Sequence, residues 1–107
     1  MQDRMPPVHP GEILYEDFMK PMGISQTRLA MDTAMPQSRI QGIIAGKRGI
    51  TADTAVRLAA YFGNSAEFWL NCQNSYELDM VAYSGKREEI LARVYPPTGP
   101  AHVCPVL

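Results

Sequence analysis

The sequence lacks the features of a membrane or secreted protein. No apolar run approaches the roughly 18 residues that a transmembrane helix requires. The first ten residues, MQDRMPPVHP, contain no apolar segment of the kind found in signal peptides. The two cysteines, Cys72 and Cys104, lie far apart and do not form a disulfide framework. We therefore expect a cytoplasmic protein with one domain, no membrane contact and a core that needs no disulfides.

The sequence also lacks the residue sets of an enzyme or a metal site. It shows no Ser/His/Asp or Cys/His set, no glycine-rich phosphate loop and no pair of carboxylates in a plausible cleft. Two scattered histidines, His9 and His102, with Cys104 near the second, do not supply four ligands at zinc spacing. We therefore expect no catalytic activity, no cofactor and no bound metal.

Positive charge is not in excess, although most DNA-binding proteins carry a basic surface. The net charge is −1. The charges are segregated, because residues 25–48 carry four Lys or Arg against one Asp, whereas residues 9–23 carry a net −2 and residues 64–79 a net −3. This distribution suits a protein that binds one DNA site through a basic patch. It also leaves an acidic surface free for a basic partner.

The segment from Ile24 to Arg48 is predicted to form two short helices joined by a tight turn. Ser25 can cap the first helix through its hydroxyl, and Gly46 can end the second in a left-handed conformation. Apolar residues at helical spacing give the two helices a shared core: Leu29, Ala30, Met35, Ile40, Ile43 and Ile44. The pattern indicates a helix-turn-helix.

The second helix of such a pair lies in the DNA major groove, with its first residues against the base edges. Here those residues are Gln37, Ser38 and Arg39, with Gln41 one turn later. All four side chains can bind bases or phosphates. The alternative is that they form an ordinary exposed helix surface, but the two well-marked helices favour DNA contact.

The rest of the chain is divided by its prolines, glycines and capping residues. Residues 1–8 are predicted to be a flexible arm, because Pro6 and Pro7 cannot start a helix. Helical patterns follow over residues 11–20, 51–62, 65–83 and 86–95, with Thr51 and Ser65 as caps and Pro21 and Gly23 ending the first. We assign residues 9–83 to a DNA-binding domain with a C-terminal dimerisation helix, 84–95 to a short helix and 96–107 to a proline-rich tail.

The helix predicted over residues 65–83 is apolar on more than one side. One stripe contains Trp69, Cys72, Tyr76, Met80 and Tyr83, while Phe68, Leu70 and Leu78 lie off it. A helix with two apolar sides needs two neighbours. We expect one to be the domain core and the other a second copy of this chain, with Phe68, Trp69, Cys72, Tyr76 and Met80 in the dimer interface.

The predicted first helix carries acidic residues near its start, namely Glu12, Glu16 and Asp17. Carboxylates at this end complement the helix dipole and commonly form a solvated face. A contact with a basic protein partner is the alternative.

Three blocks of sequence resemble a known family: HPGEIL at 9–14, SQTRLA at 25–30 and GKRGITADTAVRLAAYFGNSAEFWLNCQ at 46–73. They are similar to HigA-type (VapI-like) antitoxins, a branch of the lambda-repressor-like (Xre) helix-turn-helix proteins. The similarity covers residues 9–78, and its last block is the most specific part.

The resemblance implies an all-α, lambda-repressor-like domain of about five helices with a C-terminal helical extension. It implies a homodimer that binds a palindromic operator in double-stranded DNA upstream of its own operon and represses it. It also implies a HigB-type toxin as partner, a RelE-like ribonuclease that cleaves messenger RNA. A stand-alone Xre-type transcriptional regulator without a toxin partner is the alternative.

The resemblance also assigns roles to residues. Phosphate contacts at the start of the first helix of the pair would come from Gln26, Thr27 and Arg28, and contacts from the following loop would come from Lys47 and Arg48. Phe68, Trp69 and Leu70 match the family's core and interface segment.

The chain departs from the family pattern at three positions. Ala34 stands where the turn most often has glycine, and a positive φ there would strain it. Pro36 replaces a Ser or Thr cap, so the second helix loses a side-chain acceptor. Gly42 inside that helix costs about 1 kcal/mol relative to alanine, and the sequence offers no reason for it beyond a close backbone approach.

Overall fold

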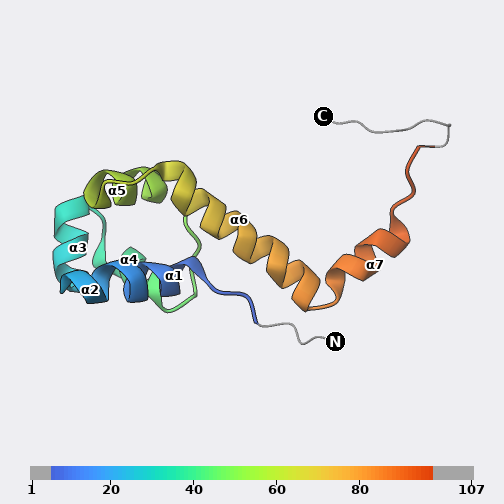
Figure 1. Cartoon of the computed structure of the whole chain (residues 1–107), viewed down its shortest axis with the longest axis horizontal. Coiled ribbons are helices and arrows are strands. Elements are labelled where there is room, and N and C mark those ends of the chain that lie inside the picture. Colours follow the sequence, from blue (N-terminus) through green and yellow to red (C-terminus); the bar gives the residue numbers. More distant parts are fainter. Residues whose placement is uncertain (1–5, 98–107) are drawn as a thin grey trace.

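The computed structural model describes residues 6–97, which form helices and no β-strand. The all-α prediction is confirmed. A head built from α1 to α5 lies at one end, α6 leads out of it, and α7 lies at the far end (Figure 1). Residues 1–5 of the predicted arm and 98–107 of the predicted tail, with His102 and Cys104, lie outside the described residues.

The helices of the head are joined by short connections, and α6 follows α5 out of the head. Their bounds are α1 (Pro10–Ile13), η1 (Leu14–Met19), α2 (Lys20–Met22), α3 (Gln26–Thr33), α4 (Gln37–Ile44), α5 (Ala52–Phe62), α6 (Ala66–Tyr83) and α7 (Lys86–Arg93). The predicted caps Ser25, Thr51 and Ser65 each accept a hydrogen bond from the backbone N–H three residues later. Between residues 6 and 97, no helix has the length and apolar character needed to cross a membrane.

The first helix of the head is one continuous run with a π-helical middle. The prediction that Pro21 ends this run is wrong, because the helix continues to Met22 and ends where Gly23 takes a φ of 66°. In an α-helix the ring of Pro21 would meet the carbonyl four residues earlier. The wider π turn before it, in which the Lys20 N–H donates to the Tyr15 carbonyl, removes that conflict.

The core of the head is formed by buried side chains of η1, α3, α4 and α5, together with Trp69 of α6. The largest fully buried ones are Leu14, Met19, Leu29, Ile40, Ile43, Leu58 and Trp69. Gly11 lets α1 cross closely over the end of α4, because a Cβ at this position would lie 1.8 Å from the Ile43 carbonyl oxygen. The predicted recognition helix, α4, is thus anchored to the core by its own isoleucines and packs closely against the backbone of α1.

Trp69 belongs to the core of its own chain, so its assignment to the dimer interface is wrong. The side chain is fully buried and its indole N–H donates to Asn64 at 2.9 Å. The rings of Phe18 and Phe68 lie 5.0 and 5.1 Å from it, centroid to centroid. These contacts join α6 to η1, so the indole anchors the exit helix to the head and leaves no surface for a second chain.

Candidate nucleic-acid interface

The turn between α3 and α4 has the geometry that the sequence predicted. Ala34 ends α3 with a φ of 56° and a ψ of 43°, the left-handed conformation that strains a residue with a Cβ. Pro36 starts α4 without a side-chain cap. The turn therefore forms despite two unfavourable residues, which means that contacts from elsewhere in the chain stabilise it.

Those contacts come from Arg57 on α5. Its Nη1 donates to the Thr33 carbonyl at 2.9 Å and to the Ala34 carbonyl at 3.1 Å. Both carbonyls belong to the last turn of α3, where backbone acceptors have no partner inside the helix. The guanidinium therefore supplies hydrogen-bond donors to the carbonyls at the end of α3 and holds the turn in this conformation. The sequence contains no local signal for this role of Arg57, because the contact joins positions 24 residues apart.

The first turn of α4 presents polar side chains to solvent. Gln37, Ser38 and Gln41 are exposed, while Ile40 and Ile43 on the opposite side are fully buried. This arrangement leaves the polar face of α4 open along its length. The predicted base-reading residues therefore share one accessible surface.

Arg39 differs from the other predicted contact residues of α4, because its side chain is already paired with a carboxylate. Its Nη1 donates to Asp53 Oδ2 at 2.8 Å, and Arg57 Nε donates to the same oxygen at 3.0 Å. Hydrogen bonds from Arg57 and then from Arg39 lower the pKa of the Asp53 carboxyl below its ordinary value. The pairing of Asp53 with Arg39 depends on how α4 and α5 meet, so it has no local signal in the sequence.

The start of α3 holds a second exposed pair. Arg28 Nε donates to Asp32 Oδ2 at 2.8 Å, and the Tyr61 hydroxyl donates to the same oxygen at 2.9 Å. The hydrogen bond to Asp32 raises the pKa of Tyr61, and the bond from Arg28 lowers that of Asp32. Thr27 and Arg28 are exposed and Gln26 is half-buried, so this predicted phosphate-binding set lies at the surface.

The structure explains why position 42 is occupied by glycine, which the sequence alone did not. A Cβ on Gly42 would lie 2.9 Å from Cδ and 3.1 Å from Cγ of Arg48. The backbone N–H groups of Lys47 and Arg48 both donate to the Gly42 carbonyl, at 2.8 and 3.1 Å. The loop after α4 thus folds back over the glycine, and the stem of Arg48 rests where a side chain would otherwise stand.

His9 joins the start of α1 to α6. Its Nδ1 accepts from the Gly11 N–H at 2.9 Å, and its ring lies edge-on to Tyr76 with centroids 4.8 Å apart. Burial lowers the pKa of His9 below its model-peptide value of 6.5. Because Nδ1 is an acceptor, this contact requires the neutral ring.

Gln73 connects the loop after α4 to α6. Its Oε1 accepts from the Ile50 N–H at 2.8 Å, and its Nε2 donates to Glu77 at 2.7 Å. Gly49 allows this approach, since a Cβ there would lie 2.8 Å from the Gln73 amide nitrogen. The loop that carries Lys47 and Arg48 is therefore fixed to the helix that leaves the head. In the sequence, this contact is indicated only by a glutamine that stands among the apolar residues of the predicted helix.

Known proteins with similar sequences and folds show to which family this chain belongs. The helix-turn-helix family matches residues 16–69. Virulence-associated protein I of Dichelobacter nodosus is 52% identical over 79 residues, which cover 74% of this chain and 73% of that protein. A solved addiction module antidote protein of the HigA family from Coxiella burnetii is 43% identical, covers 87% of this chain and 100% of its own, and has a TM-score of 0.79. The chain belongs to the HigA antitoxin family.

A second solved HigA structure was determined with DNA. The Pseudomonas aeruginosa antitoxin HigA with the higBA promoter is 39% identical to this chain, covers 84% of it and 97% of its own length, and has a TM-score of 0.77. The identity of the chain as a HigA-type helix-turn-helix protein thus agrees with the resemblance seen in its sequence.

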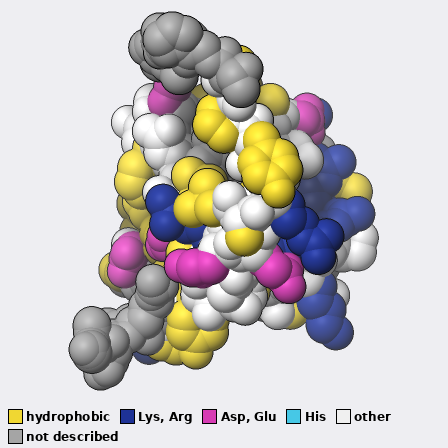
Figure 2. All heavy atoms as spheres, turned by 90° about the vertical axis from the view of Figure 1, so that its right-hand side faces the viewer, with side chains coloured by type: hydrophobic (Ala, Val, Ile, Leu, Met, Phe, Trp, Pro, Cys, Tyr) yellow, Lys and Arg dark blue, Asp and Glu magenta, His cyan; other side chains and the backbone are white. Residues whose placement is uncertain are grey.

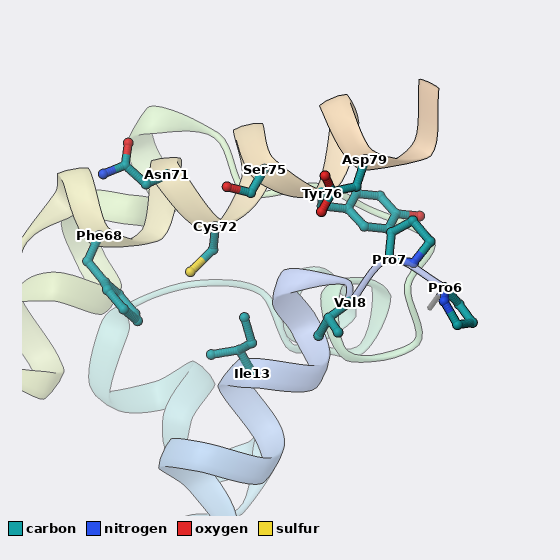
Figure 3. A pocket seen from close by; sticks show the side chains of 10 residues that line it. All are labelled: Pro6, Pro7, Val8, Ile13, Phe68, Asn71, Cys72, Ser75, Tyr76 and Asp79. Atoms are coloured by element: carbon teal, nitrogen blue, oxygen red, sulfur yellow. The ribbon is translucent and has the colours of Figure 1, made fainter. Parts of the chain in front are cut away.

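Three of the α6 residues that were expected in a dimer interface of this HigA-type chain, Phe68, Cys72 and Tyr76, line the same groove. Phe68 and Met80 are exposed, with 38% and 39% of their surface accessible. Cys72 and Tyr76 are half-buried in this groove, which lies between α6 and the start of the chain and is also lined by Pro7 (Figure 3). Burial in this groove raises the pKa of the Cys72 thiol.

Further apolar side chains are exposed beyond the groove, at the end of α6, on α7 and just after it. They are Leu78, Tyr83, Ile90, Leu91, Val94 and Tyr95. Figure 2 views this end of the molecule and shows hydrophobic side chains beside acidic ones, with Lys and Arg gathered along one edge. The short helix was predicted over 86–95, and the structure ends it at Arg93.

Proposed function

We propose that this HigA-type protein is an antitoxin and autorepressor that binds a palindromic operator upstream of its own operon. The observation that carries the proposal is the exposed polar face of α4, on which Gln37, Ser38 and Gln41 stand above a buried isoleucine row. The Pseudomonas aeruginosa relative, solved with its promoter, supports DNA as the ligand. Glutamine pairs well with adenine, and arginine with guanine or phosphate.

The nine predicted contact residues divide into two groups in this proposal. Gln37, Ser38, Arg39 and Gln41 read base edges from the first turns of α4. Phosphates are bound by Gln26, Thr27 and Arg28 at the start of α3 and by Lys47 and Arg48 in the loop after α4. The first group supplies specificity, and the second supplies affinity and salt dependence.

We propose further that the protein acts as a homodimer through α6 and α7. An eight-residue helix is too short to be stable alone in water, and α7 buries none of its residues within its own chain. Two copies meeting through this surface would place two heads on one palindrome. Phe68 and Met80 are also exposed on α6, and in this proposal they extend the contact towards the head.

The partner toxin is proposed to be a HigB-type ribonuclease, and its contact is proposed at the start of the chain. Asp17 and Glu12 are exposed there, and Glu16 is exposed in an i,i+4 pair with Lys20 at 3.4 Å. Such an acidic surface suits a basic RNA-binding partner. Replacing both Glu16 and Asp17 by lysine should weaken toxin binding and leave DNA binding in place.

The experiment that tests the DNA function is a salt-dependent titration of the full chain on its own upstream region and on scrambled DNA of equal length. We expect two chains per palindrome and a specificity ratio of about 10³ or more. Gln37→Ala should reduce the ratio by relaxing one operator position, whereas Lys47→Ala should weaken binding to both DNAs equally.

Weak and equal binding to both DNAs would refute operator recognition by the antitoxin alone. Repeating the titration with the product of the neighbouring gene then separates two outcomes. Restored specificity means that the toxin is a corepressor, and continued weak binding refutes the DNA function. Specific binding without any toxin-like neighbour would instead identify a stand-alone regulator.

A further inference from the structure

A carboxylate lies within the predicted DNA-binding surface, where it would ordinarily repel phosphates. The Asp53 side chain is more than half exposed, and its Oδ2 accepts from both Arg39 and Arg57, at 2.8 and 3.0 Å. Arg57 in turn donates to the two carbonyls at the end of α3. A continuous series of hydrogen bonds therefore runs from the helix-turn-helix turn through α5 to a side chain of the recognition helix.

We propose that Asp53 is a specificity-determining residue, which holds the Arg39 side chain ready for a base edge and away from non-specific phosphate contacts. The inference rests on the proposed binding of operator DNA. It adds a residue that does not itself read DNA, and it assigns Arg57 the role of positioning that residue.

The geometry of the pair leaves Arg39 able to read a base. A guanidinium has five N–H donors, and Asp53 occupies only Nη1. The edge formed by Nε and Nη2 remains for a bidentate contact of the kind that arginine makes with guanine. The carboxylate also removes rotamer freedom that a free arginine would lose on binding, so the operator complex pays less for ordering the side chain.

The charge of Asp53 acts differently on specific and non-specific DNA. On scrambled DNA, Arg39 would gain mainly from phosphates, and the neighbouring carboxylate offsets that gain by competing for the guanidinium. On the operator, a base edge accepts hydrogen bonds from Nε and Nη2 of Arg39, while the ion pair between Nη1 and Asp53 stays in place. Asp53 therefore lowers non-specific affinity more than specific affinity.

The test compares wild-type protein with Asp53→Asn on operator and scrambled DNA by fluorescence anisotropy. Asparagine keeps the size and an acceptor oxygen but removes the charge. We expect tighter binding to scrambled DNA and a specificity ratio that falls about two- to fivefold, which is within the range that exposed charge pairs contribute. In an Arg39→Ala background, Asp53→Asn should leave the ratio unchanged, because its partner is absent.

Asp32→Asn is the matched control, since it removes one exposed carboxylate that also accepts from an arginine and from a second donor. It should change binding to both DNAs by the same factor. Circular dichroism at the assay temperature checks that each variant is folded, and Asp53→Ser provides a second variant with an acceptable residue for the first turn of α5.

The outcomes separate this inference from the proposed function. A wild-type protein that does not distinguish the two DNAs refutes operator binding and the inference with it. A wild-type protein that does distinguish them, with an unchanged ratio in both Asp53 variants, refutes the inference alone. A fall in the ratio that persists in the Arg39→Ala background also refutes it, because the carboxylate would then act through general charge.

Discussion

Replacing Gly42 by alanine should make the protein more stable and a weaker DNA binder. Glycine inside a helix costs about 1 kcal/mol relative to alanine. Against this gain stands the contact of the new Cβ with Arg48, whose Cδ would be 2.9 Å away, whereas carbon atoms in contact lie about 3.5–4.0 Å apart. Arg48 is exposed, so its stem can move aside at little cost. We expect a net stabilisation of about 0.5–1 kcal/mol, which raises Tm by about 2–8 °C.

The same movement should cost DNA affinity. The Arg48 stem lies over Gly42, and a methyl group there displaces the guanidinium from its position beside the recognition helix. Loss of one phosphate contact per chain is a loss of two per dimer, which reduces the slope of log affinity against log salt by about 1.8. Thermal unfolding by circular dichroism measures the first effect, and anisotropy titrations between 50 and 200 mM salt measure the second.

Arg48→Ala supplies the control for this prediction. In that background, Gly42→Ala should still stabilise the helix but should change neither affinity nor salt slope. An additional loss of affinity in the double variant would mean that the methyl group itself collides with DNA. A lower Tm in the single variant would refute the view that Arg48 yields easily.

Three further predictions concern the scaffold of the interface. Gly11→Ala should destabilise the protein by about 1–3 kcal/mol in a denaturant titration, because α1 must move away from the Ile43 carbonyl. Ala34→Gly should raise the free energy of unfolding by about 1 kcal/mol, since glycine takes the left-handed turn without strain; an unchanged value would show that the turn is unstrained. His9 has a folded-state pKa below its unfolded value, so its contribution is complete above about pH 6.5 and is lost as the pH falls through the lowered value. His9→Asn, which keeps an acceptor for α1, should flatten the decline of Tm between pH 7 and 5.

The helix-turn-helix could be predicted from sequence because its determinants are local. A cap such as Ser25 acts on a backbone N–H three residues away, and a glycine such as Gly46 ends a helix by its own conformational preference. The isoleucine spacing of α4 identified its buried side for the same reason. Even the expected strain at Ala34 and the missing cap at Pro36 could be inferred one residue at a time.

The features that sequence analysis missed depend on how elements meet. Arg39 pairs with Asp53 only because the first turns of α4 and α5 lie together, although the i,i+4 pair of Asp53 and Arg57 was visible in the sequence. Trp69 was placed in the dimer interface because periodicity identifies an apolar stripe without saying which chain covers it. The requirement for glycine at position 42 could not be predicted, because it comes from the side chain of Arg48, which the following loop folds back against the helix.

The head and the extension are stabilised in different ways, and this difference bears on how the protein would find its operator. Gln73 is the last buried residue of α6, and no residue of α7 is buried. The head therefore folds around its own core, whereas in the proposed dimer the exposed apolar side chains of α6 and α7 would gain stability from a second chain. In the proposed dimer, the fold of each head is independent of protein concentration, but the pairing of two heads is not. Operator affinity should then rise steeply as the concentration crosses the dimerisation constant, while binding to a single half-site should not change.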